Sequence, residues 1–184
     1  LERWGKTDKA VLDEGISAIS QEAASMKELV ERLLFLARHD KKTLMLEMEV
    51  FDPLEVMSEV HREARLLSPA HRFELNPAQN ARISADKGMI KQLMRILVDN
   101  AIKYTPENGH IAVRLAQSGA NVLFAVTDDG IGIPEEDQKH IFERFYRVDK
   151  ARSRATGGTG LGLSIVRQLA AMHGGTVSVS SQPG

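Results

Sequence analysis

The sequence contains no cysteine, so disulfide bonds and thiolate metal sites are excluded. Its 24 Lys and Arg nearly balance its 25 Asp and Glu, and the formal net charge is -1 at pH 7. A nucleic-acid-binding surface needs clustered surplus positive charge, which this composition argues against. No apolar run approaches the roughly 20 residues of a membrane-spanning helix, and the first residues do not read as a signal peptide. We expect a soluble piece of a larger protein, with one domain and an appendage.

Apolar residues recur at alternating intervals of four and three along the first part of the chain. This spacing is typical of a helix that packs against other helices in a bundle or coiled coil. It predicts one long helix that ends in the polar stretch 38–42. The residues of this apolar seam are Leu12, Ile16, Ile19, Ala23, Met26, Val30, Leu33 and Ala37.

From residue 43 onward, strand-like and helix-like patterns mix. Asp52 before Pro53 predicts a helix start, and Asp86 predicts a second one, each aspartate acting as N-cap. We expect an α/β fold, a two-layer sandwich in which helices cover one face of a mixed sheet. The expected strands are 44–51, 72–75, 81–84, a hairpin over 110–128 with its turn at 118–121, and 175–181. The expected helices are 53–67 (burying Val56, Val60, Ala64 and Leu67), one from 87 to near Asn100, 134–145 and 161–173.

Residues 126–134, VTDDGIGIP, place Asp128 at the end of an apolar strand with two glycines close behind it. A carboxylate there is costly unless a donor faces it, and the exocyclic amine of adenine is a suitable donor. Gly130 and Gly132 would let the backbone turn tightly and pass close to the base. A strand-ending Asp-Gly turn explains the same residues without a ligand.

Residues 100–106, NAIKYTP, place Asn100 near the end of a helix, with Lys103 and Tyr104 about one turn later. Mg²⁺ prefers oxygen ligands and takes only one or two from protein where phosphates and water supply the others. The amide of Asn100 suits such a site, Lys103 can neutralise phosphate, and Tyr104 offers its ring to a base. An ordinary helix C-terminus, which also favours Lys and Asn, is the alternative.

Residues 157–163, GGTGLGL, run directly into an amphipathic helix, whose N-terminal amides and dipole attract phosphate. The segment is neither a Walker loop nor a complete Gly-x-Gly-x-x-Gly fingerprint, and a flexible linker is the alternative. The stretch 142–158 before it combines aromatic residues with arginines that can reach a terminal phosphate. The candidate residues here are Arg144, Arg147, Gly158, Thr159, Gly160, Leu161, Gly162 and Leu163.

The order of these segments resembles the N, first-glycine, F and second-glycine boxes of bacterial sensor histidine kinases. The likeness implies a Bergerat-type ATP-binding fold over 43–184, truncated at its last strand. Residues 1–42 resemble part of the dimerisation and histidine-phosphotransfer domain, chiefly its second helix. By the same resemblance Asn100 would be the Mg²⁺ ligand, Asp128 the acceptor for adenine, and Tyr104 the residue against the base. Lys103 and Arg147 would contact phosphates, and the glycines of 158–162 would form a hinge of the ATP lid.

Two departures from the family pattern bear on the reaction. Ile96 stands one turn before Asn100, where the family often has a second Asn and hydrolytic relatives have a Glu that activates water. Isoleucine cannot act as a base, which favours phosphoryl transfer over hydrolysis. The family's acceptor stretch, His-acid-x-x-Thr/Asn-Pro, is missing. Its only lookalike contains His39 but no proline, and we interpret His39 as a residue at a helix C-terminus.

We therefore expect the ATP- and Mg²⁺-binding catalytic portion of a sensor histidine kinase, with its phosphoacceptor histidine outside this chain. The expected partners are a second copy, through the bundle helices of the full-length protein, and a response-regulator receiver domain. The expected location is the cytoplasmic portion of a membrane-anchored sensor. The alternatives are an interaction module of the same fold without kinase activity, a hydrolytic repair-type ATPase, and a serine kinase of the anti-sigma type.

Overall fold

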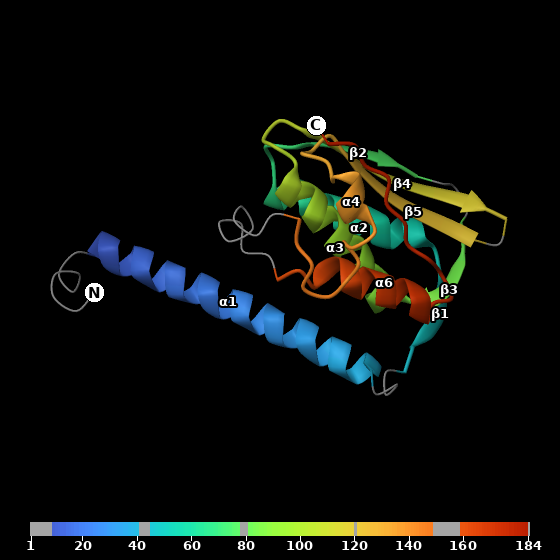
Figure 1. The fold of residues 1–184 in the computed structure, drawn as a ribbon, viewed down its shortest axis with the longest axis horizontal. Coiled ribbons are helices and arrows are strands. Elements are labelled where there is room, and N and C mark those ends of the chain that lie inside the picture. Colours follow the sequence, from blue (N-terminus) through green and yellow to red (C-terminus); the bar gives the residue numbers. More distant parts are fainter. Residues whose placement is uncertain (1–8, 41–44, 78–80, 120, 149–158, 184) are drawn as a thin grey trace. The chain divides into compact units, whose positions relative to one another are not determined.

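The computed structural model describes residues 9–40, 45–77, 81–119, 121–148 and 159–183 (Figure 1). The chain divides into two compact units, Leu1–Leu44 and Met45–Gly184, and each is described by itself. None of the described helices is both long enough and apolar enough to cross a membrane.

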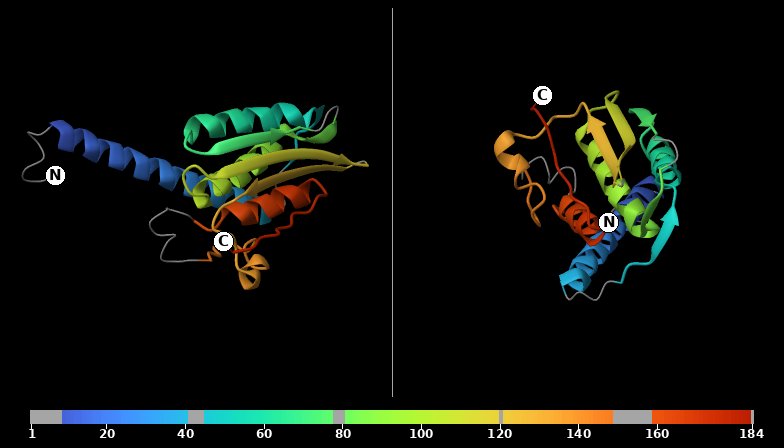
Figure 2. Two further views of the ribbon diagram at one scale, coloured as in Figure 1. Left: turned by 90° about the horizontal axis from the view of Figure 1, so that it is seen from above. Right: turned by 90° about the vertical axis from the view of Figure 1, so that its right-hand side faces the viewer.

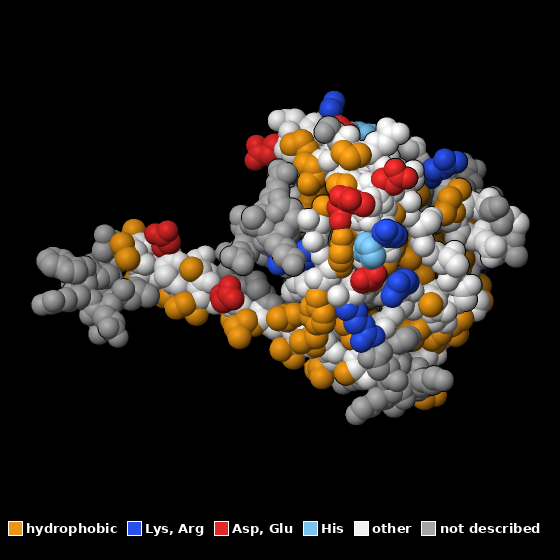
Figure 3. Space-filling model, viewed as in Figure 1, with side chains coloured by type: hydrophobic (Ala, Val, Ile, Leu, Met, Phe, Trp, Pro, Cys, Tyr) orange, Lys and Arg blue, Asp and Glu red, His pale blue; other side chains and the backbone are white. Residues whose placement is uncertain are grey.

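The described part of the first unit is one long helix, α1 (Lys9–Asp40), which confirms the predicted helix. It continues through Gly15 without a break. Its apolar seam is open to solvent, since Ile16, Ile19 and Met26 are 55%, 63% and 61% exposed. Hydrophobic side chains are visible at intervals along the helix in Figure 3. A helix with an apolar stripe of this spacing normally packs against another helix.

Three strands form the main sheet of the second unit, in the order β2-β4-β5. Strand β2 (Arg72–Asn76) runs parallel to β4 (His110–Ser118), and β4 runs antiparallel to β5 (Asn121–Asp128). The predicted hairpin is confirmed, with Ser118 paired to Asn121 at its turn. A separate antiparallel pair consists of β1 (Met48–Phe51) and β3 (Ile83–Asp86). The sheet is therefore mixed, as predicted.

The helices α2 (Pro53–Leu67), α3 (Lys87–Tyr104) and α6 (Gly162–Met172) cover one face of the main sheet (Figure 2). Helix α3 lies between α2 and α6 and also contacts the strands. Both predicted N-caps are present. Asp52 Oδ1 accepts a 2.8 Å hydrogen bond from the amide of Leu54, and Asp86 Oδ1 accepts a 2.9 Å bond from that of Met89.

The main hydrophobic core lies between this helical layer and the strands. Fully burying one aliphatic side chain contributes about 1.5–3 kcal/mol to stability, so the core fixes α2 and α3 firmly on the sheet. Helix α3 is therefore a rigid support for the residues at its C-terminal end. The buried core residues include Phe51, Val56, Met57, Val60, Ala64, Met94, Val98, Val113 and Leu115.

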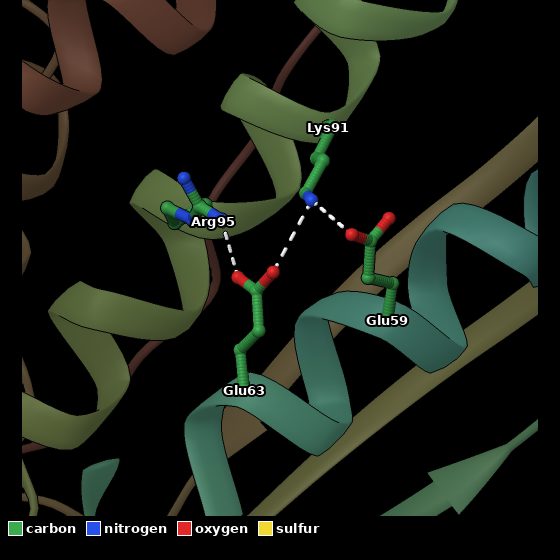
Figure 4. A network of polar contacts seen from close by, with 4 residues as sticks. All are labelled: Glu59, Glu63, Lys91 and Arg95. Carbon is green, nitrogen blue, oxygen red and sulfur yellow. Dashed lines mark hydrogen bonds and ion pairs between the residues drawn. The ribbon is translucent and has the colours of Figure 1, made fainter. Parts of the chain in front are cut away.

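A ladder of ion pairs joins the outer sides of α2 and α3 (Figure 4). Glu59 pairs with Lys91, and Glu63 pairs with both Lys91, at 3.2 Å, and Arg95. One turn earlier Glu55 lies 3.0 Å from the ammonium of Lys87. Such partly exposed pairs contribute only about 0–1 kcal/mol each. Their main consequence is that α3 neutralises the glutamates of α2.

The helix predicted over 134–145 is wrong beyond its first turn. Only α4 (Glu135–Gln138) is helical. After it the chain makes successive tight turns, in which the amide of His140 bonds to the carbonyl of Asp137 and that of Glu143 to the carbonyl of His140, both at 2.8 Å. Apart from the bond of the Ile141 amide to the carbonyl of Asp137, the bonds after α4 within this region span three residues instead of four, so an α-helix does not propagate.

Three smaller predictions also need correction. Residues 175–181 form no strand, although their exposure alternates, and the side-chain bonds to this segment lie at its end, at Ser181. In these bonds the amide of Ile133 donates to Ser181 Oγ at 2.9 Å. Strand β1 begins at Met48 instead of at residue 44. Leu67, predicted in the buried face of α2, is 78% exposed because it is the last residue of the helix.

Candidate nucleotide-binding site

The C-terminal end of α3 and the loop after β5 are in backbone contact. The amide of Ile131 donates a 3.2 Å hydrogen bond to the carbonyl oxygen of Tyr104. A Cβ atom on Gly130 would lie 2.6 Å from the same oxygen, which leaves no room for a side chain. The structure thus brings the predicted segments 100–104 and 128–132 together, and this close approach requires glycine at 130.

The two adjacent aspartates after β5 have different partners. Asp129 Oδ1 accepts a 2.7 Å bond from the amide of His110, which fixes the start of β4. Asp128 Oδ1 accepts a 3.1 Å bond from the amide of Gly130, and its side chain is exposed. The cost of a buried carboxylate, expected from the sequence, therefore does not arise in this structure. The carboxylate is already oriented by one backbone donor.

Gly132 makes room for a distant part of the chain. Its φ of 66° lies in the left-handed region, and a Cβ there would lie 1.9 Å from the carbonyl oxygen of Gln182. Gln138 Nε2 ties the same region together by donating to the carbonyls of Ile133, at 2.9 Å, and Ser181, at 2.8 Å. The close approach at Gly132 is thus between the loop after β5 and the segment that contains Gln182, and it involves no ligand.

Asn100, Lys103 and Tyr104 lie in the last turns of α3. Asn100 is half-buried, and its Nδ2 is buried without a hydrogen-bond partner among the described residues. The ammonium of Lys103 lies 5.4 Å from the centre of the Tyr104 ring, a cation–π distance. The Tyr104 side chain is 39% exposed. This helix end therefore presents an unsatisfied amide, a cation and an accessible ring within one turn.

Ile96 lies one turn before Asn100 and is only 7% exposed. Its side chain is part of the buried side of α3, where a carboxylate would be strongly destabilising. The helix offers no group at this position that could take a proton from water.

Arg147 carries two buried guanidinium nitrogens, Nε and Nη2, that have no hydrogen-bond partner among the described residues. Leaving such donors unsatisfied costs about 1–3 kcal/mol or more, so the position favours an anionic ligand. Arg144, the other predicted arginine, is exposed.

The segment that carries these arginines is joined to the start of α6. The amide of Phe145 donates a 2.9 Å bond to the carbonyl of Gly160. Gly160 has a φ of 70°, and a Cβ on it would lie 2.8 Å from the carbonyl carbon of Phe145. Because α6 packs directly on α3, the arginine segment, the start of α6 and the end of α3 belong to one connected region.

Within the described part of the chain, no side chain caps the N-terminus of α6. Leu161 occupies the cap position without a side-chain hydrogen bond to the first turn, and its own amide makes a long 3.4 Å bond to Thr159 Oγ1. The amides of Gly162 and Leu163 are in the first turn of the helix, where backbone donors lack intrahelical partners. Leu161 itself is fully buried. Gly158 lies outside the described residues.

The sequence did not indicate a polar cluster beside Arg147. The Tyr146 hydroxyl donates to Asp137 Oδ1, and this hydrogen bond is the main cause that raises the pKa of Tyr146 to about 12. His140 Nδ1 lies 2.7 Å from Glu143 Oε1, and its ring lies 5.3 Å from that of Tyr146. No periodic pattern links these residues, because the contact depends on the tight turns after α4.

Residues 85–184 match the family described as "Histidine kinase-, DNA gyrase B-, and HSP90-like ATPase". The chain belongs to this ATPase family. Every candidate site residue, from Asn100 to Leu163, lies within the matched range. The family assignment agrees with the mixed sheet covered by helices.

Relatives of this ATPase-family chain are histidine kinases. It is 40% identical to the signal transduction histidine-protein kinase ArlS of Staphylococcus aureus (strain USA300) over 184 residues. The alignment covers 99% of this chain and 41% of ArlS, so the chain spans about two fifths of the curated relatives it matches.

Solved structures of histidine kinases have the same fold as this ATPase-family chain. The Acinetobacter baumannii histidine kinase AdeS aligns with a TM-score of 0.73 at 27% identity, covering 97% of this chain and 81% of AdeS. Full-length ShkA, crystallised in complex with AMPPNP, aligns with a TM-score of 0.77 at 28% identity, covering 94% of this chain and 36% of ShkA.

Proposed function

We propose that this chain is the ATP-binding catalytic portion of a sensor histidine kinase. It transfers the γ-phosphoryl group of ATP to a histidine, from which an aspartate of a response regulator collects it. The observation that carries this proposal is the contact between Ile131 and Tyr104, which joins the two segments proposed to hold the base and the metal. Membership in the ATPase family supports the same assignment.

Asp128 is the proposed acceptor for the exocyclic amine of adenine. One of its oxygens is oriented by the amide of Gly130, and the carboxylate is exposed, so a second donor can approach it. Guanine carries a carbonyl at the corresponding position and would face the carboxylate with a second acceptor. The ring of Tyr104 is accessible for contact with the base.

Arg147, Lys103 and the first turn of α6 are the proposed contacts of the phosphates. Among the described residues, the buried guanidinium nitrogens of Arg147 have no hydrogen-bond partner, and no side chain caps the α6 amides. Charge-assisted bonds from a guanidinium to phosphate are among the stronger hydrogen bonds in proteins. The N-terminus of a helix also favours the negative charge of a phosphate.

Asn100 is the proposed protein ligand of Mg²⁺. The described residues contain no group of three or more His, Asp or Glu side chains that could hold a metal ion. A cation bound here would therefore take most of its oxygens from phosphates and water, as Mg²⁺ does in kinase sites. When bound, the ion neutralises charge that develops on the phosphate oxygens.

Phosphoryl transfer, and not hydrolysis, is the proposed reaction. Ile96 is buried and apolar, so the chain positions no base for water at this point. An imidazole nitrogen forms the new bond to the γ-phosphorus while the bond to the β–γ bridging oxygen breaks, and ADP leaves with that electron pair. Catalysis of this transfer requires that the phosphates be positioned and their negative charge stabilised, and Lys103 and Arg147 are the proposed residues for both.

The partners of the whole protein belong to the same proposal. The exposed apolar seam of α1 fits a second copy of the chain, packed helix against helix. We place the acceptor histidine outside these 184 residues and the chain on the cytoplasmic side of a membrane-anchored sensor. A receiver domain is the proposed recipient of the phosphoryl group.

Radiolabelled ATP tests the transfer. The acceptor protein is the longer product of the same reading frame, carrying Asp128→Asn to weaken its own binding of ATP and used at an ATP concentration too low to fill its site. Adding this chain with Mg·ATP should label the longer product and leave this chain unlabelled. Label on this chain that disappears in His39→Ala would contradict our placement of the acceptor. Release of phosphate without any labelled protein would favour hydrolysis, and no heat of Mg·ATP binding in calorimetry would favour a nucleotide-free module.

A further inference from the structure

A cationic depression lies at the C-terminal end of α2. It has a volume of about 450 Å³ and is lined by Arg65, Pro69, His71, Arg72 and Phe73. No aspartate or glutamate is among these lining residues, and none of them belongs to the candidate nucleotide site. Two guanidinium groups therefore give the depression a positive charge.

This positive charge has no counter-ion in the described part of the chain. The glutamates of α2 are engaged by α3 in the ladder of Figure 4, whereas Arg62 and Arg65 form no ion pair with a described carboxylate. Burial lowers the pKa of His61, and the positive charge of Arg65 lowers it further. The helix dipole accounts for a cation such as Arg65 in the last turn, but not for Arg72, the first residue of β2.

The walls of the depression are held by hydrogen bonds. His71 Nε2 donates to the carbonyl of Thr105 at 3.1 Å, and the other ring nitrogen lies 2.6 Å from the hydroxyl of Ser68. Arg72 Nε donates to the carbonyl of Asn108 at 3.1 Å. Binding to a wall that is already ordered costs less conformational entropy than binding to free side chains.

Exposed apolar side chains occur at the same C-terminal end of α2 as Arg65. Leu66 and Leu67, the neighbours of Arg65 in sequence, are each 78% exposed. Phe73 in the lining has the rings of His61 and His71 near its edge, at centroid distances of 6.0 and 6.3 Å. A free inorganic ion makes no use of such surface, whereas a peptide with alternating acidic and apolar side chains matches both properties.

We propose that this depression docks an acidic segment of a partner protein that also carries apolar side chains. Carboxylates of the segment lie at Arg65 and Arg72, and its apolar side chains cover Leu66 and Leu67. The proposal does not rest on the proposed function, because it uses none of the residues assigned to the nucleotide.

The test is a titration followed in amide NMR spectra of this chain. The probe is the peptide acetyl-Asp-Leu-Glu-Leu-Asp-amide, and saturable shifts are expected within residues 65–73. Arg65→Glu should weaken binding at least tenfold, and Leu66→Ser should weaken it measurably. Arg82→Glu makes the same charge change at another exposed arginine and should leave the affinity unchanged. The unaffected part of each spectrum reports that the variant is folded.

Four outcomes would overturn the proposal. The first is unchanged affinity in Arg65→Glu, and the second is an equal loss in Arg82→Glu. The third is equal shifts from inorganic phosphate at the same concentration, which would mean an adventitious ion only. The fourth is equal affinity for a peptide whose leucines are replaced by serine, which would mean that the apolar side chains take no part.

Discussion

The amide of Phe145 bonds to the carbonyl of Gly160, and both residues have backbone angles in the left-handed region, with φ of 65° and 70°. For a bulky residue such as phenylalanine this conformation costs on the order of 1–3 kcal/mol. It persists because the surrounding contacts fix it. This hydrogen bond joins the segment that carries Arg147 to the residues at the start of α6. It therefore fixes the position of Arg147 relative to the first turn of α6, the two proposed phosphate contacts.

Gly160→Ala should disrupt this junction. The new Cβ would lie 2.8 Å from the Phe145 carbonyl carbon, in addition to the strain of a positive φ. We expect a loss of about 2–3 kcal/mol in the free energy of unfolding, measured in urea, and weaker Mg·ATP binding. Gly119→Ala is the matched control, because Gly119 has a φ of 59° but nothing within 4 Å of its Cβ position. Equal effects of the two variants would show that the contact with Phe145 is unimportant.

Asp128→Asn should weaken ATP binding at least tenfold, about 1.4 kcal/mol, because the charge of the proposed acceptor for the adenine amine is lost. Asp129→Ala is the control next to it. It removes the bond to the His110 amide, so it should lower stability by about 0.5–1.5 kcal/mol with a smaller effect on affinity. Calorimetry measures the affinity of each variant for Mg·ATP, and urea unfolding measures its stability, so the two variants can be distinguished. Unchanged affinity in Asp128→Asn would mean that the base is recognised elsewhere.

Arg147→Met should separate stability from binding. The substitution removes two buried donors that have no partner in the described structure, so the free energy of unfolding should stay the same or rise. The affinity for Mg·ATP should fall at least tenfold, measured by calorimetry, because the proposed phosphate contact is lost. Arg114→Met, at an exposed position on β4, should change neither quantity. A clear loss of stability in Arg147→Met would contradict the assignment of Arg147 to a ligand.

Tyr146 should ionise late in an alkaline titration. Its hydrogen bond to Asp137 raises its pKa from 10.0 to about 12, so the neutral form is favoured in the folded state. The stabilisation is fully present below pH 10.0 and is lost as the pH rises toward 12. The chain has two tyrosines, so phenolate absorbance can be followed directly. Tyr146→Phe should abolish the late component, and a late component that persists in this variant would refute the assignment.

Local signals in the sequence were enough to predict most of the fold. Asp52 and Asp86 cap their helices as their residue types suggest, and the hairpin turns at 118–121 because alternation fixes its register. The helix predicted over 134–145 failed because its end is decided by distant contacts, including the bond from Phe145 to Gly160. Leu67 was expected to be buried from its spacing alone, which carries no information on where the sheet ends.

The segments that form the candidate site were predictable from the sequence, but the hydrogen bonds of individual residues within it were not. The sequence predicted that Asn100–Tyr104 and Asp128–Gly132 come together, and the bond between Ile131 and Tyr104 confirms that they do. It did not assign Asp129 to the His110 amide, because that bond depends on the pairing of β4 with β5. The unsatisfied nitrogens of Arg147 likewise follow from burial, which depends on the tertiary structure.

Gly132 has a consequence for how glycine motifs are interpreted. A side chain at this position would clash with the carbonyl of Gln182, a residue of the same polypeptide. Glycine is therefore required here whether or not a nucleotide is present. A homologue that had lost ATP would still need glycine at this position to keep its chain packed. A glycine at the second position of such a motif therefore indicates that the chain packs closely on itself there, and does not by itself indicate nucleotide binding. The aspartate at 128 is the more informative residue for inferring nucleotide recognition.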